Sequence, residues 1–139
     1  MDNKVVEYDK EHGSNDHHQA RAGPPHRDSQ RRDDALASPT LGGAERSLCR
    51  VDMAPAQSGP QHRFDSEQIW TALSGAATVE LEDVAHVLEA GDTIVIPADL
   101  PRRILADPGA GFVAIVTAAP QARATMADGT DRGVPAWIS

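Results

Sequence analysis

The chain between Gly59 and Arg103 consists of short apolar runs separated by turn residues. It reads GPQHRFDSEQIWTALSG, then ATVELEDVAHVLEA, then GDTIVIPADLPRR. Short runs bounded by glycine, proline and acidic turn residues are typical of β-strands, and no stretch carries a useful helical period. We therefore predict an all-β chain that forms a barrel or a sandwich.

The predicted strands continue on both sides of this stretch. They cover the segment from Arg46 to Pro55, and residues 69–73, 76–81, 84–88, 93–96, 103–106 and 112–117, with a turn at Gly75. The first of them alternates, so that Ser47, Cys49, Val51 and Met53 share one face. We expect that face to point into the core, which makes Cys49 a small core residue rather than a nucleophile.

The chain divides into three parts by composition. Residues 1–45 mix both charge signs with few apolar side chains, so we expect a mostly flexible arm, with a possible strand at 4–8. Residues 46–118 form the predicted barrel. Residues 119–139 form a loop-rich tail whose Val134, Trp137 and Ile138 we expect to dock on the barrel. A lid over the barrel mouth is the alternative role for this tail.

Composition excludes several function classes. A net charge of -8 argues against nucleic acid, which requires a clustered basic surface. No apolar run approaches the roughly 20 residues that a spanning helix needs, and the polar start does not resemble a secretory signal. The single cysteine excludes an intrachain disulfide framework. We expect no membrane contact, a cytoplasmic location and a small-molecule substrate as the partner.

Two glycine-framed motifs resemble those of the cupin superfamily, whose members are small β-barrels of the double-stranded jelly-roll type. The first family motif consists of a glycine, two histidines, a glutamate and a closing glycine. The corresponding positions of this chain hold Gly59, His62, Phe64, Gln68 and Gly75. The second family motif consists of a glycine, a proline, a second glycine and a histidine. The corresponding positions here hold Gly91, Pro97, Asp99 and Arg102. The resemblance covers roughly residues 46–118 and implies a cupin-type jelly-roll barrel.

The resemblance also implies a metal held by three histidines and one glutamate, and this chain departs from that set. Only His62 remains, with Phe64, Gln68 and Arg102 at the other three positions and Glu67 one residue out of register. Phe64 has no donor atom and Arg102 carries a fixed positive charge. Since catalytic metal sites generally take three protein ligands, we expect no metal and no other cofactor.

If the cupin register holds, the predicted site residues point into the barrel. His62 would move a proton, and Arg102 would stabilise the oxyanion that forms. Gln68 would orient the substrate, and Phe64 and Trp70 would stack on a flat ligand. Glu67 completes the predicted substrate-binding set, although a rim or surface charge is its plainer interpretation.

Each residue also has a structural interpretation. His62 is alternatively explained as a hydrogen-bonded barrel histidine, and Arg102 as a salt-bridge partner of Asp99 or Glu67. Phe64 and Trp70 fit core packing at least as well as a binding wall.

The leading hypothesis is a cofactor-free isomerase or cyclase acting on a small carbonyl metabolite. Cupin relatives that work without metal include sugar epimerases and isomerases, and cupins also serve as cyclases in polyketide pathways, so the resemblance is compatible with this class. A non-catalytic small-molecule-binding cupin is the alternative, and a metal-dependent dioxygenase is the third hypothesis. We also expect a homodimer, because a small jelly roll leaves sheet faces and edges uncovered, with residues 4–8 as a candidate exchanged strand.

Overall fold

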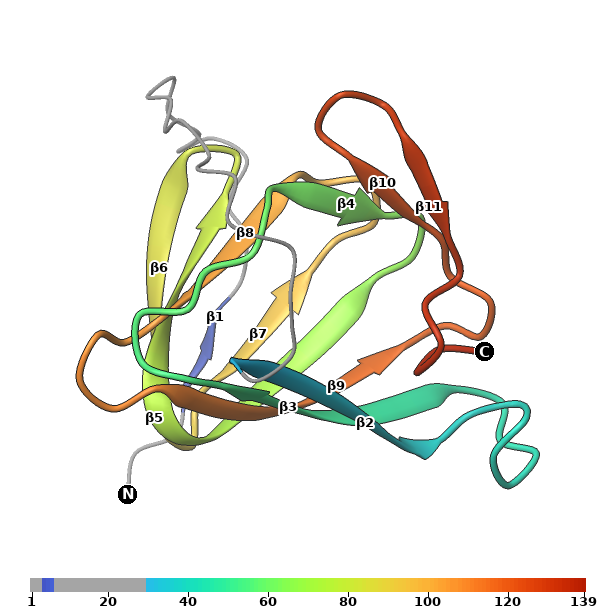
Figure 1. Cartoon of the computed structure of the whole chain (residues 1–139), viewed down its shortest axis with the longest axis horizontal. Helices are drawn as coiled ribbons and strands as arrows, with labels where there is room; N and C mark the ends of the chain where they lie inside the picture. The colour runs from blue at the N-terminus through green and yellow to red at the C-terminus, as the bar shows by residue number, and fades with distance from the viewer. Residues whose placement is uncertain (1–3, 7–29) are drawn as a thin grey trace.

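The described part of the chain is built from β-strands alone (Figure 1). The computed structural model describes residues 4–6 and 30–139. Its strands are β1 (Val5–Val6), β2 (Arg31–Ala37), β3 (Ser47–Met53), β4 (His62–Phe64), β5 (Gln68–Leu81), β6 (Val84–Glu89), β7 (Thr93–Ile96), β8 (Arg102–Ala106), β9 (Phe112–Ala118), β10 (Ala124–Met126) and β11 (Asp131–Gly133). The prediction of an all-β jelly-roll barrel is confirmed. Nowhere in these residues is there a helix suited to crossing a membrane.

Strand β5 joins the two layers of the barrel. Its first half pairs with β7 and β9, in a layer ordered β1-β7-β5-β9-β3-β2. Its second half pairs with β6 and β8, in a layer that continues through β4 to β10 and β11. All pairings between these named strands are antiparallel except that of β1 with β7. Figure 1 shows the resulting curled sheet, with β2, β3 and β9 on one side and β4, β8 and β10 on the other.

The core lies between the two layers. Along β3 the residues Ser47, Cys49, Val51 and Met53 are buried, which confirms the predicted inward face. The corresponding positions of β5, β8 and β9 also alternate between buried and partly exposed side chains. Burial raises the pKa of the Cys49 thiol to about 12, so this side chain is an inert core residue.

Gly75 bends β5 and does not end it, so the predicted turn between residues 73 and 76 is wrong. The residue has a positive φ of 69° and pairs with Phe112 on β9. The backbone N–H of Ala76 then donates to the Gly111 carbonyl oxygen at 3.0 Å, so the ladder continues through the bend. A left-handed glycine thus redirects the strand from one layer to the other.

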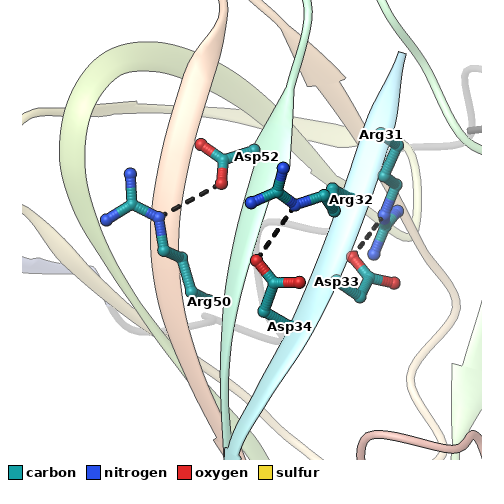
Figure 2. Close-up of polar contacts among 6 residues, drawn as sticks. All are labelled: Arg31, Arg32, Asp33, Asp34, Arg50 and Asp52. Carbon is teal, nitrogen blue, oxygen red and sulfur yellow. Dashed lines mark hydrogen bonds and ion pairs between the residues drawn. The ribbon is translucent and has the colours of Figure 1, made fainter. Parts of the chain in front are cut away.

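Strand β2 lies in the range for which we predicted a mostly flexible arm, and for Arg31–Ala37 that prediction is wrong. The strand pairs with β3 along its length. Its charges are satisfied along the strand, because Arg31 Nε lies 2.9 Å from Asp33 Oδ1 and Arg32 Nε lies 3.1 Å from Asp34 Oδ2 (Figure 2). Residues 1–3 and 7–29 of the predicted arm lie outside the described residues.

The two ends of the described chain contact the barrel. Val5–Val6 adds to the edge of the chain's own sheet beside β7, with Val6 packed against the core. Tyr8, in the same predicted strand, lies outside the described residues. In the C-terminal segment Trp137 and Ile138 are buried, and the Ser47 hydroxyl donates to the Ile138 carbonyl oxygen at 2.6 Å.

Candidate functional site

The short strand β4 brings the two predicted catalytic residues to neighbouring positions. His62 on β4 is the direct register partner of Arg102 on β8. Directly opposite residues of an antiparallel pair project to the same face, and here the buried neighbours Phe64 and Ile104 mark that face as the inner one. The two residues therefore lie side by side on adjacent strands, and not across the barrel from one another.

Arg102 is buried, and neutral acceptors surround its guanidinium group. Nε donates to the Leu100 carbonyl oxygen at 3.0 Å and Nη2 to the Pro97 carbonyl oxygen at 3.2 Å. Nη1 donates to Gln68 Oε1 at 3.0 Å, and the guanidinium carbon lies 5.6 Å from the centre of the Phe64 ring. Burial lowers the pKa of Arg102 to about 10, partly offset by the charge of Asp99.

No carboxylate of the described residues lies within ion-pair distance of Arg102. Within residues 4–6 and 30–139, Arg102 therefore forms no salt bridge with Asp99 or Glu67, the alternative that the sequence suggested. The geometry favours a structural role, in which Arg102 ties the loop after Pro97 to the barrel interior and supports Phe64.

Gln68 and Trp70 belong to the interior beneath this site. Gln68 Oε1 accepts hydrogen bonds from Trp70 Nε1 at 3.2 Å and from Arg102 Nη1 at 3.0 Å. Two donors on one oxygen determine the orientation of the amide, whose Nε2 is buried without an acceptor among the described residues. The Trp70 ring stacks on Phe112 at 6.3 Å between centroids. Both side chains are therefore placed as packing residues, away from the cavities described below.

A cavity of about 370 Å³ lies at the end of the barrel beside β4. Of the predicted site residues, His62 and Phe64 line it. The other walls come from distant parts of the sequence, namely from Arg31 and Asp33 on β2, Pro60, Ala124 and Met126 on β10, Arg132 on β11, and Pro135, Ala136 and Trp137. The buried Trp137 thus forms a wall of this cavity.

His62 is neutral, and its tautomer is determined by its neighbour. Its Nδ1 lies 3.0 Å from the Pro60 carbonyl oxygen, which can only accept, so Nδ1 carries the hydrogen and Nε2 retains its lone pair. Burial lowers the pKa of His62 to about 4, and the positive charges of Arg102 and Arg31 act in the same direction. The ring also meets the Phe64 ring edge to face at 5.3 Å. The result is an uncharged proton acceptor beside the cavity.

Two arginines that our sequence analysis did not identify lie around this cavity. Arg31 uses Nε to bind Asp33, whereas no ion pair is found for Arg132 among the described residues. With one carboxylate against two guanidinium groups, the lining carries a net positive charge. In the RRDD segment at residues 31–34 each arginine has an aspartate two residues later, and this spacing is the signal that identifies β2 in retrospect. No comparable pattern marks Arg132.

Glu67 lies apart from this cavity, because its side chain is exposed and lines neither of the two cavities. A second cavity, of about 580 Å³, lies beside β5, β6 and β8, where Thr78, Val87 and Arg103 are among its lining residues. It contains none of the predicted site residues. We therefore take the smaller cavity as the candidate site, because it holds the only predicted residue with a free basic lone pair.

The residues at the four metal-ligand positions do not fit a metal ion. Only His62 offers an uncommitted lone pair, because Phe64 has none, Arg102 is a cation, and Gln68 Oε1 already accepts two hydrogen bonds. No other group of three His, Cys, Asp or Glu side chains is arranged to hold a metal within residues 4–6 and 30–139. We derive no chemistry through a metal.

Comparison with known proteins agrees with the motif analysis. The model of the family described as "Cupin domain" matches residues 49–116. No curated protein matches the chain. Among solved structures, the polyketide cyclase RemF from Streptomyces resistomycificus is 23% identical with a TM-score of 0.60, and the match covers 65% of each chain.

Two further solved structures have the same fold. A sugar phosphate isomerase from Silicibacter pomeroyi is 18% identical with a TM-score of 0.58, over 72% of this chain and 67% of that one. A salicylate 1,2-dioxygenase from Pseudaminobacter salicylatoxidans is 15% identical with a TM-score of 0.63, over 76% of this chain but only 33% of that one. The chain thus spans a little under two thirds of the cyclase and a third of the dioxygenase. These likenesses show the fold alone.

Proposed function

The chain contains a domain of the cupin superfamily, and from this premise we propose that it is a metal-independent enzyme that moves a proton on a small carbonyl-containing metabolite. Isomerisation and cyclisation are the two reactions that such a step serves. The observation that carries the proposal is the state of His62, a neutral imidazole whose Nε2 lone pair is free beside a cavity of about 370 Å³. A neutral imidazole of this tautomer is a general base.

The proposed step begins with removal of a proton from a carbon next to the substrate carbonyl. His62 Nε2 takes the proton, the C–H bonding pair moves into a new carbon–carbon double bond, and the carbonyl oxygen becomes an enolate. Return of the proton to the opposite face of the same carbon inverts that centre, and in a substrate whose enolate is conjugated with a second double bond, return of the proton to the far carbon of that double bond shifts the double bond; either completes an isomerisation. Attack of the enolate carbon on a second carbonyl of the same molecule, followed by loss of water, completes a cyclisation.

The positive lining of the cavity supports an anionic substrate. Arg31 and Arg132 supply guanidinium groups for a carboxylate or phosphate, or for the enolate oxygen. In this proposal they take over the oxyanion role that we first expected of Arg102, whose guanidinium group donates to the oxygens of Leu100, Gln68 and Pro97. A bound anion also raises the pKa of His62, since negative charge stabilises the imidazolium ion. That shift makes the imidazole a stronger base in the complex.

Two structural neighbours support the reaction class by their names, polyketide cyclase and sugar phosphate isomerase. Both names describe rearrangement of a small molecule rather than oxidation. We extend this reaction class to the present chain because His62 remains as a base beside the cavity, whereas the other three metal-ligand positions hold Phe64, Gln68 and Arg102.

Solvent deuterium exchange tests the proposal. Protein in D₂O is incubated with small keto acids and sugar phosphates, and incorporation next to the carbonyl is followed by NMR. We expect exchange with the native protein and at least roughly a 100-fold loss in the His62→Gln variant, because general-base catalysis contributes about 10²-fold or more. His86→Gln is the matched control, since this histidine of β6 does not line the cavity. Equal rates for the native and His62→Gln proteins would contradict the role of His62.

A non-catalytic small-molecule-binding cupin is the second candidate, favoured by the packed interior around Gln68 and Trp70. It predicts that planar anions such as benzoate bind the cavity while no substrate exchanges deuterium. A metal-dependent dioxygenase is the third candidate, and the donor set at positions 62, 64, 68 and 102 argues against it.

A further inference from the structure

The larger of the two cavities, of about 580 Å³, lies on the outer face of the layer formed by β6, the second half of β5, and β8; we call it the outer cavity. The buried residues Val79 on β5 and Ile104 on β8 mark the inner face of this layer. Thr78, Arg103 and Leu105 alternate with them along the same strands, so these side chains point outward. The sheet itself therefore separates the outer cavity from the candidate site beside β4.

The floor of the outer cavity follows the register of neighbouring segments. Thr78 of β5 pairs with Val87 of β6 on one side and with Leu105 of β8 on the other. Leu105 also forms a bridge with Ser58, in the segment between β3 and β4. Val87 is 53% exposed, although an apolar side chain of this size gains free energy from burial. The floor thus offers apolar surface that a ligand can cover.

Arg103 provides a positive charge at one end of the outer cavity. Its Nε is buried without an acceptor, and its guanidinium group forms no ion pair within residues 4–6 and 30–139. Glu80, its register partner on β5, is not within ion-pair distance of it. Arg102, the preceding residue, differs because three oxygens of the protein accept its hydrogen bonds. The donors of Arg103 therefore remain for an acceptor that a ligand supplies.

Asp107 lies at the opposite end of the outer cavity, just after β8 ends. Four residues at the rise of a strand separate it from Arg103 by about 13 Å. Its Oδ2 accepts from the backbone N–H groups of Gly109 and Ala110 at 2.9 and 2.8 Å, so this carboxylate is engaged within its own turn. It also repels a second anion. A ligand with one anionic group therefore places that group at Arg103 and extends its apolar part over Leu105.

We propose that the outer cavity is a binding site for a small free monocarboxylate with an apolar chain. The carboxylate accepts hydrogen bonds from Arg103, and the chain covers Leu105 and Val87. Among the described lining residues Arg103 is the only cation, and Ser58 and Thr78 add neutral hydroxyl groups. A dianion such as a phosphate monoester is matched less well by a single guanidinium group. The inference is independent of the proposed enzyme activity, because the two cavities lie on opposite faces of the sheet.

Titration of octanoate into the ¹⁵N-labelled full chain, followed by NMR, tests the proposal. We expect saturable shifts of the Thr78, Val87 and Leu105 amides. Arg103→Gln should bind octanoate at least about tenfold more weakly, because hydrogen bonds between charged groups are the strong ones. Arg63→Gln is the matched control and should bind like the native chain. Arg63 is exposed, forms no ion pair within the described residues and lines neither cavity.

Neutral and shortened probes separate the charge from the chain. Octan-1-ol has the same chain without the charge, so Arg103→Gln should bind it as the native chain does. Butanoate should bind at least about tenfold more weakly than octanoate, since it buries four fewer CH₂ groups. Octanoate shifts confined to Ala124 and Met126 would place the ligand in the candidate site and overturn the proposal. Absence of saturable shifts, or equal octanoate affinity of the native and Arg103→Gln proteins, would also overturn it.

A second variant tests the apolar wall without touching Arg103. Val87→Glu should keep the fold, because the side chain is exposed, and should weaken octanoate binding at least about tenfold by placing a carboxylate against the chain. Leu73→Glu is its control, since this residue is 47% exposed and lines neither cavity. Unchanged affinity in Val87→Glu would contradict the proposed site.

A peptide that ends in apolar residues carries the same carboxylate and a similar apolar body. N-acetyl-leucyl-leucine is therefore titrated beside octanoate, with the same three amides as the readout. Tighter binding of octanoate supports a free acid as the ligand. Tighter binding of the dipeptide would assign the site to a peptide terminus and overturn the proposal of a free acid.

Discussion

A single carbonyl oxygen decides what His62 can do. The Pro60 carbonyl holds the hydrogen on Nδ1, and burial together with the charges of Arg102 and Arg31 disfavours the imidazolium form. Position 62 and its inward direction could be predicted from the motif spacing. The tautomer could not, because it depends on how a loop carbonyl is turned, and loop geometry leaves no periodic signal in a sequence.

His62 should make the stability of the protein depend on pH. Its pKa is about 4 in the folded chain against an ordinary value of 6.5, so above pH 6.5 both states are neutral. Between pH 6.5 and 4 the unfolded chain binds a proton that the folded chain does not, and folding stability is lost. The native protein should lose on the order of 3 kcal/mol more over this interval than His62→Gln. Urea unfolding at a series of pH values measures the difference.

Parallel curves for the two proteins between pH 6.5 and 4 would show that His62 titrates normally. The burial that lowers the pKa of His62 in the structure would then be wrong. Carboxylates elsewhere titrate in both proteins and cancel in the comparison.

Arg102 illustrates the same limit of prediction at a second residue. Its motif position indicated an inward guanidinium, and burial of a charge suggested an anionic partner from the ligand. The structure satisfies the charge with the carbonyl oxygens of Leu100 and Pro97 and the amide oxygen of Gln68. Only the last of these partners is a side chain, so the sequence offered little information about the other two.

At the scale of elements, β5 depends on Gly75 to pair with strands of both layers. At Gly75 an added Cβ would lie 2.1 Å from the Gly111 carbonyl oxygen, where β5 and β9 cross closely. The turn predicted at Gly75 is instead a bend within one strand. A glycine between two apolar runs marks either a turn or a bend, and the two differ only in the long-range pairing of the flanking residues.

Gly75→Ala should therefore destabilise the barrel by more than the cost of backbone strain. Gly43 is the matched control, because its φ of +66° is close to the +69° of Gly75 while nothing lies within 4 Å of its added Cβ. Gly43→Ala should cost about 1–2 kcal/mol, the penalty for a left-handed alanine. Gly75→Ala should cost at least about 2 kcal/mol more, because backbone atoms must move. Chemical denaturation measures both, and equal losses would contradict the close approach of β5 and β9.

Strand β2 shows how composition can mislead. The segment RRDDALA has high charge, which is typical of solvated or flexible segments. On an edge strand, however, both faces can carry charge if each cation has an anion two residues away. The spacing of opposite charges was present in the sequence, but the pairing of β2 with β3 is a non-local contact that the local pattern did not determine.

At the scale of the whole molecule, the candidate cavity is formed by segments that are distant in sequence. Its walls come from β2, β4, β10, β11 and the C-terminal segment, and only β4 and the preceding Pro60 lie in the motif region from which we predicted the site. The barrel itself was predictable because strand alternation and turn residues are local signals. The cavity was not, because it depends on how both flanking segments fold back over one end of the barrel.

Ile138 should be the residue that holds the C-terminal segment on the barrel. It is fully buried, and its carbonyl oxygen accepts the hydrogen bond of the buried Ser47 hydroxyl. Ile138→Ala should lower the free energy of unfolding by about 2–5 kcal/mol, as for other buried isoleucines, whereas the exposed control Leu41→Ala should stay within about 0.5 kcal/mol of the native value. Because the adjacent Trp137 lines the cavity, the same variant should also bind benzoate more weakly. Thermal unfolding and NMR titration measure the two effects, and equal stability of the two variants would contradict a docked segment.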